Sequence, residues 1–212
     1  KSQDGKIHQL WEDAKLKMYD NSDKGSSYKK EVEQLDEYFN EEKINSLHKK
    51  GSGHEDSKFL DTLFSKAVSE YANCISKENL PDIIHCQDAS TAMIPFFVSK
   101  NHVLNDTRTV VTIHNAGPFY HHEYKDISEA AWLSSFPETC FKDCMNGKKI
   151  EPFLVASEYG ALRTTVSPYY VEEITNPIFN HETDGLASIF SSKNIPVTGI
   201  TNGIDADLYE PA

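Results

Sequence analysis

The feature that most constrains the fold is an alternation of short β-branched segments with longer segments of helical periodicity. The predicted strands are residues 82–86, 108–113, 163–166 and 196–200. Short, apolar or β-branched runs bounded by turn formers are typical of buried strands in a parallel sheet. Their alternation with helical segments predicts βαβ units. The chain is therefore expected to adopt an α/β fold with a Rossmann-like, doubly wound parallel sheet.

Helical periodicity is clearest over residues 56–76, with Asp56 as the expected N-cap. This helix is predicted to pack through an apolar stripe against the sheet or another helix. The stripe consists of Phe59, Leu60, Leu63, Phe64, Ala67, Val68, Tyr71, Ala72 and Ile75. Further helices are predicted over residues 89–100, bent by Pro95, and over 151–162 and 168–174, the last capped by Ser167.

The first part of the chain differs in character from the rest. Residues 7–18 and 28–39 carry apolar residues at helical spacing, and a Gly- and Ser-containing linker follows at 51–56. This pattern predicts a variable, mostly helical segment at 1–50 and one Rossmann-like domain at 51–212. A chain of 212 residues is long enough for one substantial core.

Charge and cysteine content limit the function classes. The chain carries 21 Lys and Arg against 33 Asp and Glu, a net charge of −12, which disfavours nucleic acid or an anionic membrane as partner. The four cysteines lack the spacing of a disulfide scaffold, so free thiols are expected. No apolar run reaches the roughly 20 residues of a membrane span, and no signal-peptide core begins the chain. A cytoplasmic protein is expected, and a first residue other than Met looks like an internal cut.

Polar residues follow three of the predicted strands. They are residues 85–88 after the first strand, His114 and Asn115 after the second, and residues 202–205 after the fourth. In open parallel sheets ligands bind beyond the carboxyl ends of the strands. These residues are therefore the candidates for function.

These strand ends, taken in order, resemble the family-5 glycosyltransferases, the bacterial glycogen synthases and plant starch synthases. Residues 81–88 (PDIIHCQD) are similar to the family's strand ending in His-x-His-Asp, and 111–115 (VTIHN) to its Thr-Ile-His-Asn strand. Residues 163–174 (RTTVSPYYVEEI) resemble the family almost residue for residue. Residues 184–186 (DGL) and 199–205 (GITNGID) complete the pattern in the family's order.

The resemblance implies the GT-B architecture, two Rossmann-like domains across a cleft, of which this chain supplies part of the N-terminal, acceptor-side domain without the second. It implies a glycogen or starch synthase that transfers glucose from ADP-glucose to the non-reducing end of an α-1,4-glucan with retention, using no cofactor and no metal. The implied partners are an α-glucan acceptor and a nucleotide sugar. Because the family's Lys-x-Gly-Gly-Leu loop and second-domain motifs are missing, the fragment alone is expected to be inactive.

Two departures from the family keep alternatives open. Ala89 and Ser90 replace a Trp-His pair, and residues 116–120 replace a Tyr-Gln-Gly segment. Another retaining GT-B transferase, of the sucrose- or trehalose-forming type, or a non-catalytic glucan-binding module would also fit. The choice between ADP and UDP as the donor nucleotide stays open.

Within this resemblance, His114 and Asp88 are the expected catalytic residues. His114 is predicted to hydrogen-bond a glucose hydroxyl while its main-chain carbonyl faces the anomeric carbon. Asp88 is predicted to accept hydrogen bonds from substrate hydroxyls. The structural alternative is that Asp88 caps the helix that begins near Ala89. Asn115, Asn202 and Asp88 are expected to bind substrate, although Asn202 followed by glycine is equally a turn signal.

Three other features favour structural interpretations. His85 is expected to be a buried, hydrogen-bonded residue beneath the site. His121 and His122 with Glu123 raise the idea of a metal site, but adjacent histidines point in different directions and no third ligand is evident. An aromatic cluster is expected mainly to pack a loop, with stacking on sugars as the alternative. Its members are Phe119, Tyr120, Tyr124, Trp132 and Phe136.

Overall fold

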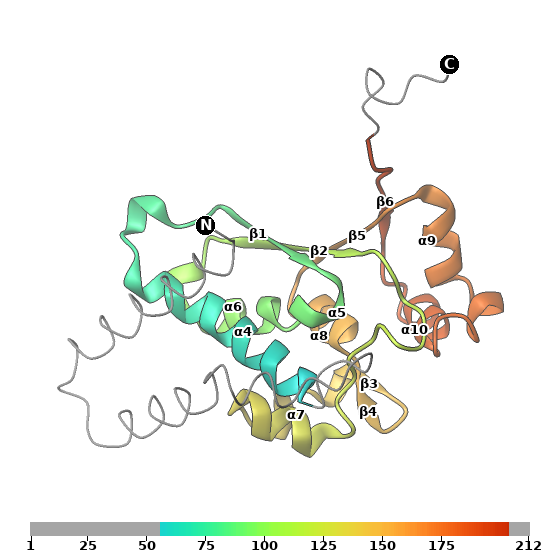
Figure 1. Ribbon diagram of the computed structural model, residues 1–212, viewed down its shortest axis with the longest axis horizontal. Coiled ribbons are helices and arrows are strands. Elements are labelled where there is room, and N and C mark those ends of the chain that lie inside the picture. The colour runs from blue at the N-terminus through green and yellow to red at the C-terminus, as the bar shows by residue number, and fades with distance from the viewer. Residues whose placement is uncertain (1–55, 204–212) are drawn as a thin grey trace, which may run out of the picture.

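A computed structural model describes residues 56–203, which form a mixed α/β domain around a four-stranded parallel sheet (Figure 1). The strand order is β1-β2-β5-β6. The strands are β1 (Ile83–Gln87), β2 (Arg108–Ile113), β5 (Leu162–Thr165) and β6 (Thr198–Gly199). The predicted α/β fold with a parallel sheet is confirmed, and β6 is shorter than the predicted strand.

Figure 1 shows α5 (Asp88–Thr91), α6 (Ile94–Lys100) and α8 (Pro152–Glu158) on one side of the sheet, with α4 (Ser57–Tyr71) beneath them. The strand order advances in one direction, and right-handed crossovers then put successive helices on the same face. A doubly wound sheet gains its second helical layer where the strand order reverses. The four described strands include no such reversal.

The core under the sheet is centred on Phe96 of α6, which is fully buried. Its ring centroid lies 4.9 Å from that of Phe136, 5.0 Å from that of Phe141 and 4.8 Å from that of Tyr159. The predicted helix at 89–100 is two helices, α5 and α6. Pro95 stands in the first turn of α6, where its missing N–H breaks no hydrogen bond.

The remaining elements lie around the ends of the sheet. Asp126 caps α7 (Ile127–Ser134), and Ser167 caps α9 (Pro168–Thr175) as predicted, accepting the N–H of Tyr170 at 3.0 Å. The sequence did not predict α7, α10 (Leu186–Ser192) or the hairpin of β3 (Met145–Asn146) and β4 (Lys149–Ile150). Short 3₁₀ turns occur at Ala72–Cys74, Lys77–Asn79, His102–Leu104, Glu138–Cys140, Lys142–Cys144 and Pro177–Phe179.

Only part of the predicted apolar stripe is buried: Ala72, just after α4, belongs to the core, and Val68 packs against it. The buried residues of α4 are Thr62, Ser65 and Ser69, whereas Phe64 and Tyr71 are 56% and 49% exposed. The stripe prediction was wrong for Phe64 and Tyr71, and it missed the buried Thr62, Ser65 and Ser69 because it counted only apolar residues.

Hydroxyl groups take the place of apolar contacts on α4. Thr62 Oγ1 lies 2.7 Å from the Tyr124 hydroxyl, and Ser69 donates to the carbonyl of Phe97 at 3.1 Å. Burial of a hydroxyl is tolerated when it is hydrogen-bonded in this way. Asp56 does stand at the N-cap of α4, but its side chain makes no capping hydrogen bond.

Several sequence predictions concern residues outside 56–203. The helices predicted at 7–18 and 28–39, and the boundary near residue 50, lie outside the described residues. All four cysteines are described and free, as predicted. Among the helices of residues 56–203, none has both the length and the hydropathy to cross a membrane.

The close approach of β6 to α9 generates a prediction about Gly199. A Cβ atom at this position would lie 2.6 Å from backbone atoms of Ser167 and Pro168. Gly199→Ala is therefore expected to lower the free energy of unfolding by about 1–3 kcal/mol, because backbone rather than a flexible side chain must move. Urea denaturation measures the change. Gly203→Ala is the matched control, since a Cβ there meets nothing within 4 Å; equal losses in both variants would contradict the steric argument.

Candidate functional site

The candidate site lies where β1 and β2 end side by side. The two strands pair in parallel up to Gln87 and Thr112, so the residues that follow them meet at one edge of the sheet. Asp88 Oδ1 accepts the backbone N–H groups of His114, at 2.7 Å, and Asn115, at 3.3 Å. The structure thus brings together three of the four predicted site residues.

Asp88 has a left-handed backbone, with φ of 56°. This conformation costs a non-glycine residue roughly 1–2 kcal/mol, which the two hydrogen bonds to its carboxylate offset. The alternative role as a helix cap is wrong, because α5 begins at Asp88 itself and the carboxylate binds the loop after β2. Among residues 56–203, Oδ2 of Asp88 has no hydrogen-bond partner, so it is available to a ligand.

His114 is exposed, and its Nε2 lies 2.8 Å from Oε1 of Gln87. With the amide oxygen facing the ring, Nε2 donates and Nδ1 is left for a ligand. Gln87 was not among the predicted site residues. Its signal in the sequence was its place as the last residue of the first strand, immediately before Asp88.

The two asparagines differ in their relation to this cluster. Asn115 Oδ1 accepts the N–H of Gly117 at 2.8 Å, which closes a turn. Asn202 follows β6, whose Gly199 pairs with Thr165 of β5, so it lies at the same edge of the sheet but beyond β5. Asn202 is exposed, and no hydrogen bond joins it to Asp88 or His114. The structure therefore does not unite it with the other three.

His85 was expected to be buried beneath the site, and this was wrong. Its side chain is exposed, on the opposite face of β1 from the buried Cys86. His85 Nε2 lies 2.6 Å from Thr112 Oγ1, which lies 2.7 Å from Thr164 Oγ1. His85 is hydrogen-bonded, as expected, but its partner is Thr112 of the neighbouring strand on the exposed face of the sheet.

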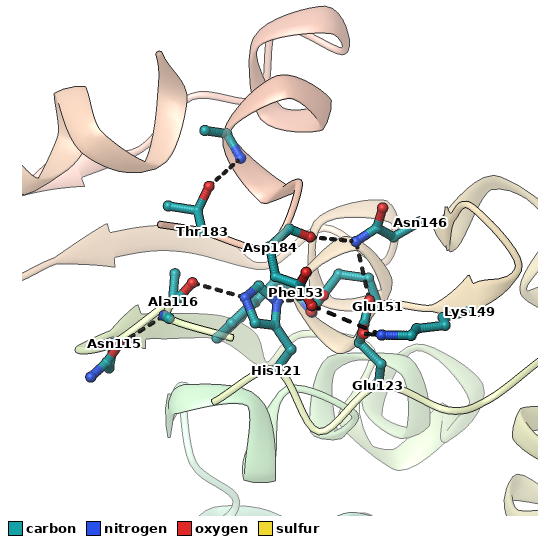
Figure 2. A network of polar contacts seen from close by, with 12 residues as sticks. Asn115, Ala116, His121, Glu123, Asn146, Lys149, Glu151, Phe153, Thr183 and Asp184 are labelled. Carbon is teal, nitrogen blue, oxygen red and sulfur yellow. Dashed lines mark hydrogen bonds and ion pairs between the residues drawn. The ribbon is translucent and has the colours of Figure 1, made fainter. Parts of the chain in front are cut away.

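His121 and His122 point to different partners. His121 Nδ1 lies 2.7 Å from Glu151 Oε2 and its Nε2 lies 2.8 Å from the carbonyl oxygen of Ala116, as Figure 2 shows. His122 Nδ1 lies 2.6 Å from Asp61 Oδ2. Within the range 56–203 no group of three His, Cys, Asp or Glu side chains is arranged to hold a metal ion.

The pair of His121 and Glu151 is almost wholly buried. Burial alone would lower the pKa of the imidazole, but the hydrogen bond and charge of Glu151 raise it above its ordinary value. Burial raises the pKa of Glu151 in turn. Sequence reasoning missed this pair because Glu151 lies thirty positions away and no spacing rule connects the two.

A second polar cluster links the loop after β2, the hairpin of β3 and β4, and the segment at 184–186 (Figure 2). Glu123 accepts from Lys149, at 2.5 Å, and from Asn146 Nδ2, at 3.1 Å. Asn146 Nδ2 also donates to the backbone oxygen of Asp184 at 3.1 Å. The hairpin of β3 and β4 thereby joins the loop after β2 to the Asp-Gly-Leu segment at 184–186.

A cleft of about 610 Å³ opens between the start of α4 and the loop at 118–125. Its lining includes Asp61, His122 and the ring of Phe119, which is 92% exposed. Carboxylate and imidazole groups beside an exposed ring are groups that bind sugar hydroxyls and sugar faces. Because His121 and Pro118 also line it, the cleft adjoins the loop that carries His114.

The aromatic residues that were expected to pack the loop divide into two groups. Tyr124 is buried and Phe136 packs on Phe96, as expected. Phe119, Tyr120 and Trp132 are instead exposed. Packing explains only the first group.

The chain is similar to proteins named glycogen synthase and to a starch synthase. Residues 3–189 match the family described as the starch synthase catalytic domain. The chain is 32% identical over 176 residues to a glycogen synthase of Alkaliphilus metalliredigens, covering 75% of this chain and 33% of that protein. It is 33% identical over 161 residues to glycogen synthase 1 of Synechocystis, covering 76% of this chain and 29% of that protein.

A solved structure shows the same fold. The catalytic domain of starch synthase IV from Arabidopsis thaliana, bound to ADP and acarbose, superposes with a TM-score of 0.61 at 27% identity. The match covers 76% of this chain and 33% of that one. The chain thus spans about a third of the length of the proteins it matches.

The pair of His122 and Asp61 predicts a pH dependence of stability. The hydrogen bond that His122 donates to the carboxylate of Asp61 raises the pKa of His122. The contribution of this pair to the free energy of unfolding is therefore fully present below the pKa of His122 in the unfolded chain, about 6.5. It is lost as the pH rises through the higher pKa of His122 in the folded protein. Asp61→Asn is expected to remove this part of the pH dependence, about 0.5–1 kcal/mol for a partly exposed pair. Urea unfolding of the wild type and of Asp61→Asn at several pH values from 5.5 to 8.5 measures the free energy of unfolding. If this free energy changes with pH in parallel in the two proteins, the pair is not the source of the pH dependence.

Proposed function

Because the chain belongs to the starch synthase catalytic domain family, we propose that it is the acceptor-side part of a glucosyltransferase that extends an α-glucan from a nucleotide sugar. The observation that carries the proposal is the cluster of Asp88, His114 and Asn115 at the carboxyl edge of a parallel sheet, where such sheets bind ligands.

The finer proposal is transfer of glucose from ADP-glucose to the non-reducing end of an α-1,4-glucan, with retention. The names of the bacterial relatives support the glycogen product. The Arabidopsis starch synthase bound to ADP and acarbose supports an adenine nucleotide and a glucan-like ligand. No cofactor or metal is proposed, since the sugar nucleotide itself supplies the leaving group.

In the proposed mechanism, the bond between the anomeric carbon and the diphosphate oxygen breaks, the acceptor hydroxyl oxygen bonds to that carbon on the same face, and the hydroxyl proton passes to the departing diphosphate. His114 and Asp88 orient the glucosyl ring. Nδ1 of His114 and Oδ2 of Asp88 bind sugar hydroxyls, and the main-chain carbonyl of His114 faces the anomeric carbon. As the diphosphate departs, partial positive charge develops at that carbon, and a fixed carbonyl dipole stabilises it. Such stabilisation depends on a backbone that is already in place before the reaction.

A prediction for the reacting centre concerns Asp88. Asp88→Asn keeps an oxygen that can accept from His114 and Asn115 but loses the negative charge. The kcat of the whole protein is expected to fall about 10–100-fold, the amount that a charged hydrogen bond contributes. Glucan-dependent release of ADP from ADP-glucose, and of UDP from UDP-glucose, measures the rate.

Asp106→Asn is the matched control for this experiment, because Asp106 is exposed before β2, at the other end of that strand. Wild-type kcat in Asp88→Asn would remove Asp88 from the reaction. A whole protein that binds maltoheptaose but releases neither nucleotide would overturn the transfer and support the non-catalytic glucan-binding alternative, which Ala89 and Ser90 favour.

A prediction for the acceptor side concerns the cleft beside Phe119. A glucan chain is proposed to stack on this exposed ring. Phe119→Ala is expected to weaken the binding of maltoheptaose about 5-fold, which corresponds to a stacking contribution near 1 kcal/mol. Isothermal titration calorimetry measures the affinity. Trp132→Ala removes another exposed ring, which does not line the cleft, and should leave the affinity unchanged; the reverse result would place the glucan elsewhere.

A further inference from the structure

Ala116, the residue that follows His114 and Asn115, is held at both its backbone N–H and its backbone carbonyl group. Ala116 is fully buried. Its N–H donates to the hydroxyl oxygen of Tyr170 at 2.7 Å, and its carbonyl oxygen lies 2.8 Å from Nε2 of His121. Figure 2 shows the ring of His121 beside this carbonyl. Tyr170 comes from α9, and His121 comes from a later part of the same loop, five residues after Ala116.

Tyr170 connects the loop to α9. It stands in the first turn of that helix, and its own N–H is bound by the capping Ser167. Burial raises the pKa of the Tyr170 phenol, so the group is a neutral hydroxyl at ordinary pH. Its oxygen therefore accepts from Ala116 without placing a buried charge beside the loop.

His121 connects the backbone carbonyl of Ala116 to α8. A carbonyl oxygen only accepts, so Nε2 of His121 must carry the proton on that side. One further proton lies between Nδ1 and Glu151 Oε2, and the pair is neutral overall whichever atom holds it. Glu151 Oε1 also accepts the N–H of Phe153 at 3.1 Å, so the carboxylate caps α8 at the same time.

We propose that Tyr170, His121 and Glu151 are positioning residues for the transfer reaction. They fix the backbone N–H and carbonyl of Ala116, and with them the backbone of His114 and Asn115. The inference rests on the proposed function. Asp88 binds two N–H groups of this segment, Tyr170 and His121 bind the next N–H and carbonyl, and Glu151 holds His121 in place. A backbone displacement of about 1 Å at a reacting centre can slow a reaction on the order of 100-fold.

Tyr170→Phe tests the first part of the proposal. This variant loses only the hydroxyl that accepts from Ala116. In the whole protein we expect kcat with ADP-glucose to fall about 10-fold while KM for maltoheptaose is unchanged. Hydrogen exchange of a peptide covering residues 110–120, followed by mass spectrometry, should become faster.

Tyr159→Phe is the matched control. It loses a hydroxyl that also binds a backbone group, the carbonyl of Cys140 at 2.7 Å, far from the loop. Its kcat and its exchange at 110–120 should equal those of the wild type. An unchanged exchange rate in Tyr170→Phe, or an equal fall of kcat in both variants, would overturn the proposal.

Two changes at Glu151 test the second part. Glu151→Gln can donate to Nδ1 of His121 and still accept from Phe153, so it should retain most of the wild-type kcat. Glu151→Leu can do neither and should lose at least 10-fold, with faster exchange at 110–120. Equal activity of these two variants would show that the buried pair does not position the loop.

Failure of the proposed function has a separate signature. A wild-type protein that transfers no glucose from ADP-glucose or UDP-glucose would overturn the transfer reaction. The exchange rates at 110–120 in Tyr170→Phe and Tyr159→Phe would still decide whether Tyr170 holds this backbone.

Discussion

The two hydrogen bonds that Asp88 Oδ1 accepts from the backbone of His114 and Asn115 are the contact on which the site depends. They join the end of β1 to the end of β2 at the edge of the sheet. They also account for the left-handed backbone of Asp88, which would otherwise be an uncompensated cost. Since α5 begins at the same residue, one side chain fixes the start of a helix layer and the geometry of the neighbouring loop.

Buried polar groups, rather than apolar contacts, set the positions of the elements around this edge. Thr62 and Ser69 hold α4 to Tyr124 and Phe97 through hydroxyl groups, and His121 holds the loop after β2 to Glu151. Each such group is costly to bury without a partner and is satisfied only in one arrangement. The arrangement of the loops is therefore more sharply specified than apolar packing alone would make it.

The accuracy of the sequence predictions follows the range of the interactions involved. The strands and the cap of α9 were predicted well, because β-branched runs and a Ser-Pro pair act within a few residues. The buried face of α4 was predicted only in part, because Phe64 and Tyr71 are apolar yet exposed, whereas Ser65 is polar yet buried. Which face of a helix is buried depends on what packs against it, and local periodicity does not contain that information.

The sequence by itself determined the α/β class, the order of the strands along the chain and the family motifs that contain Asp88, His114 and Asn115. It also identified their common edge, since carboxyl ends of parallel strands lie together. Only the tertiary structure decided that Gln87 faces His114 and that Asn202 makes no hydrogen bond with Asp88 or His114. It also decided that Tyr170 and His121 both bind the backbone of Ala116. These contacts join residues from 27 to 54 positions apart, or depend on how a loop folds back, and no periodicity or short motif encodes such distances.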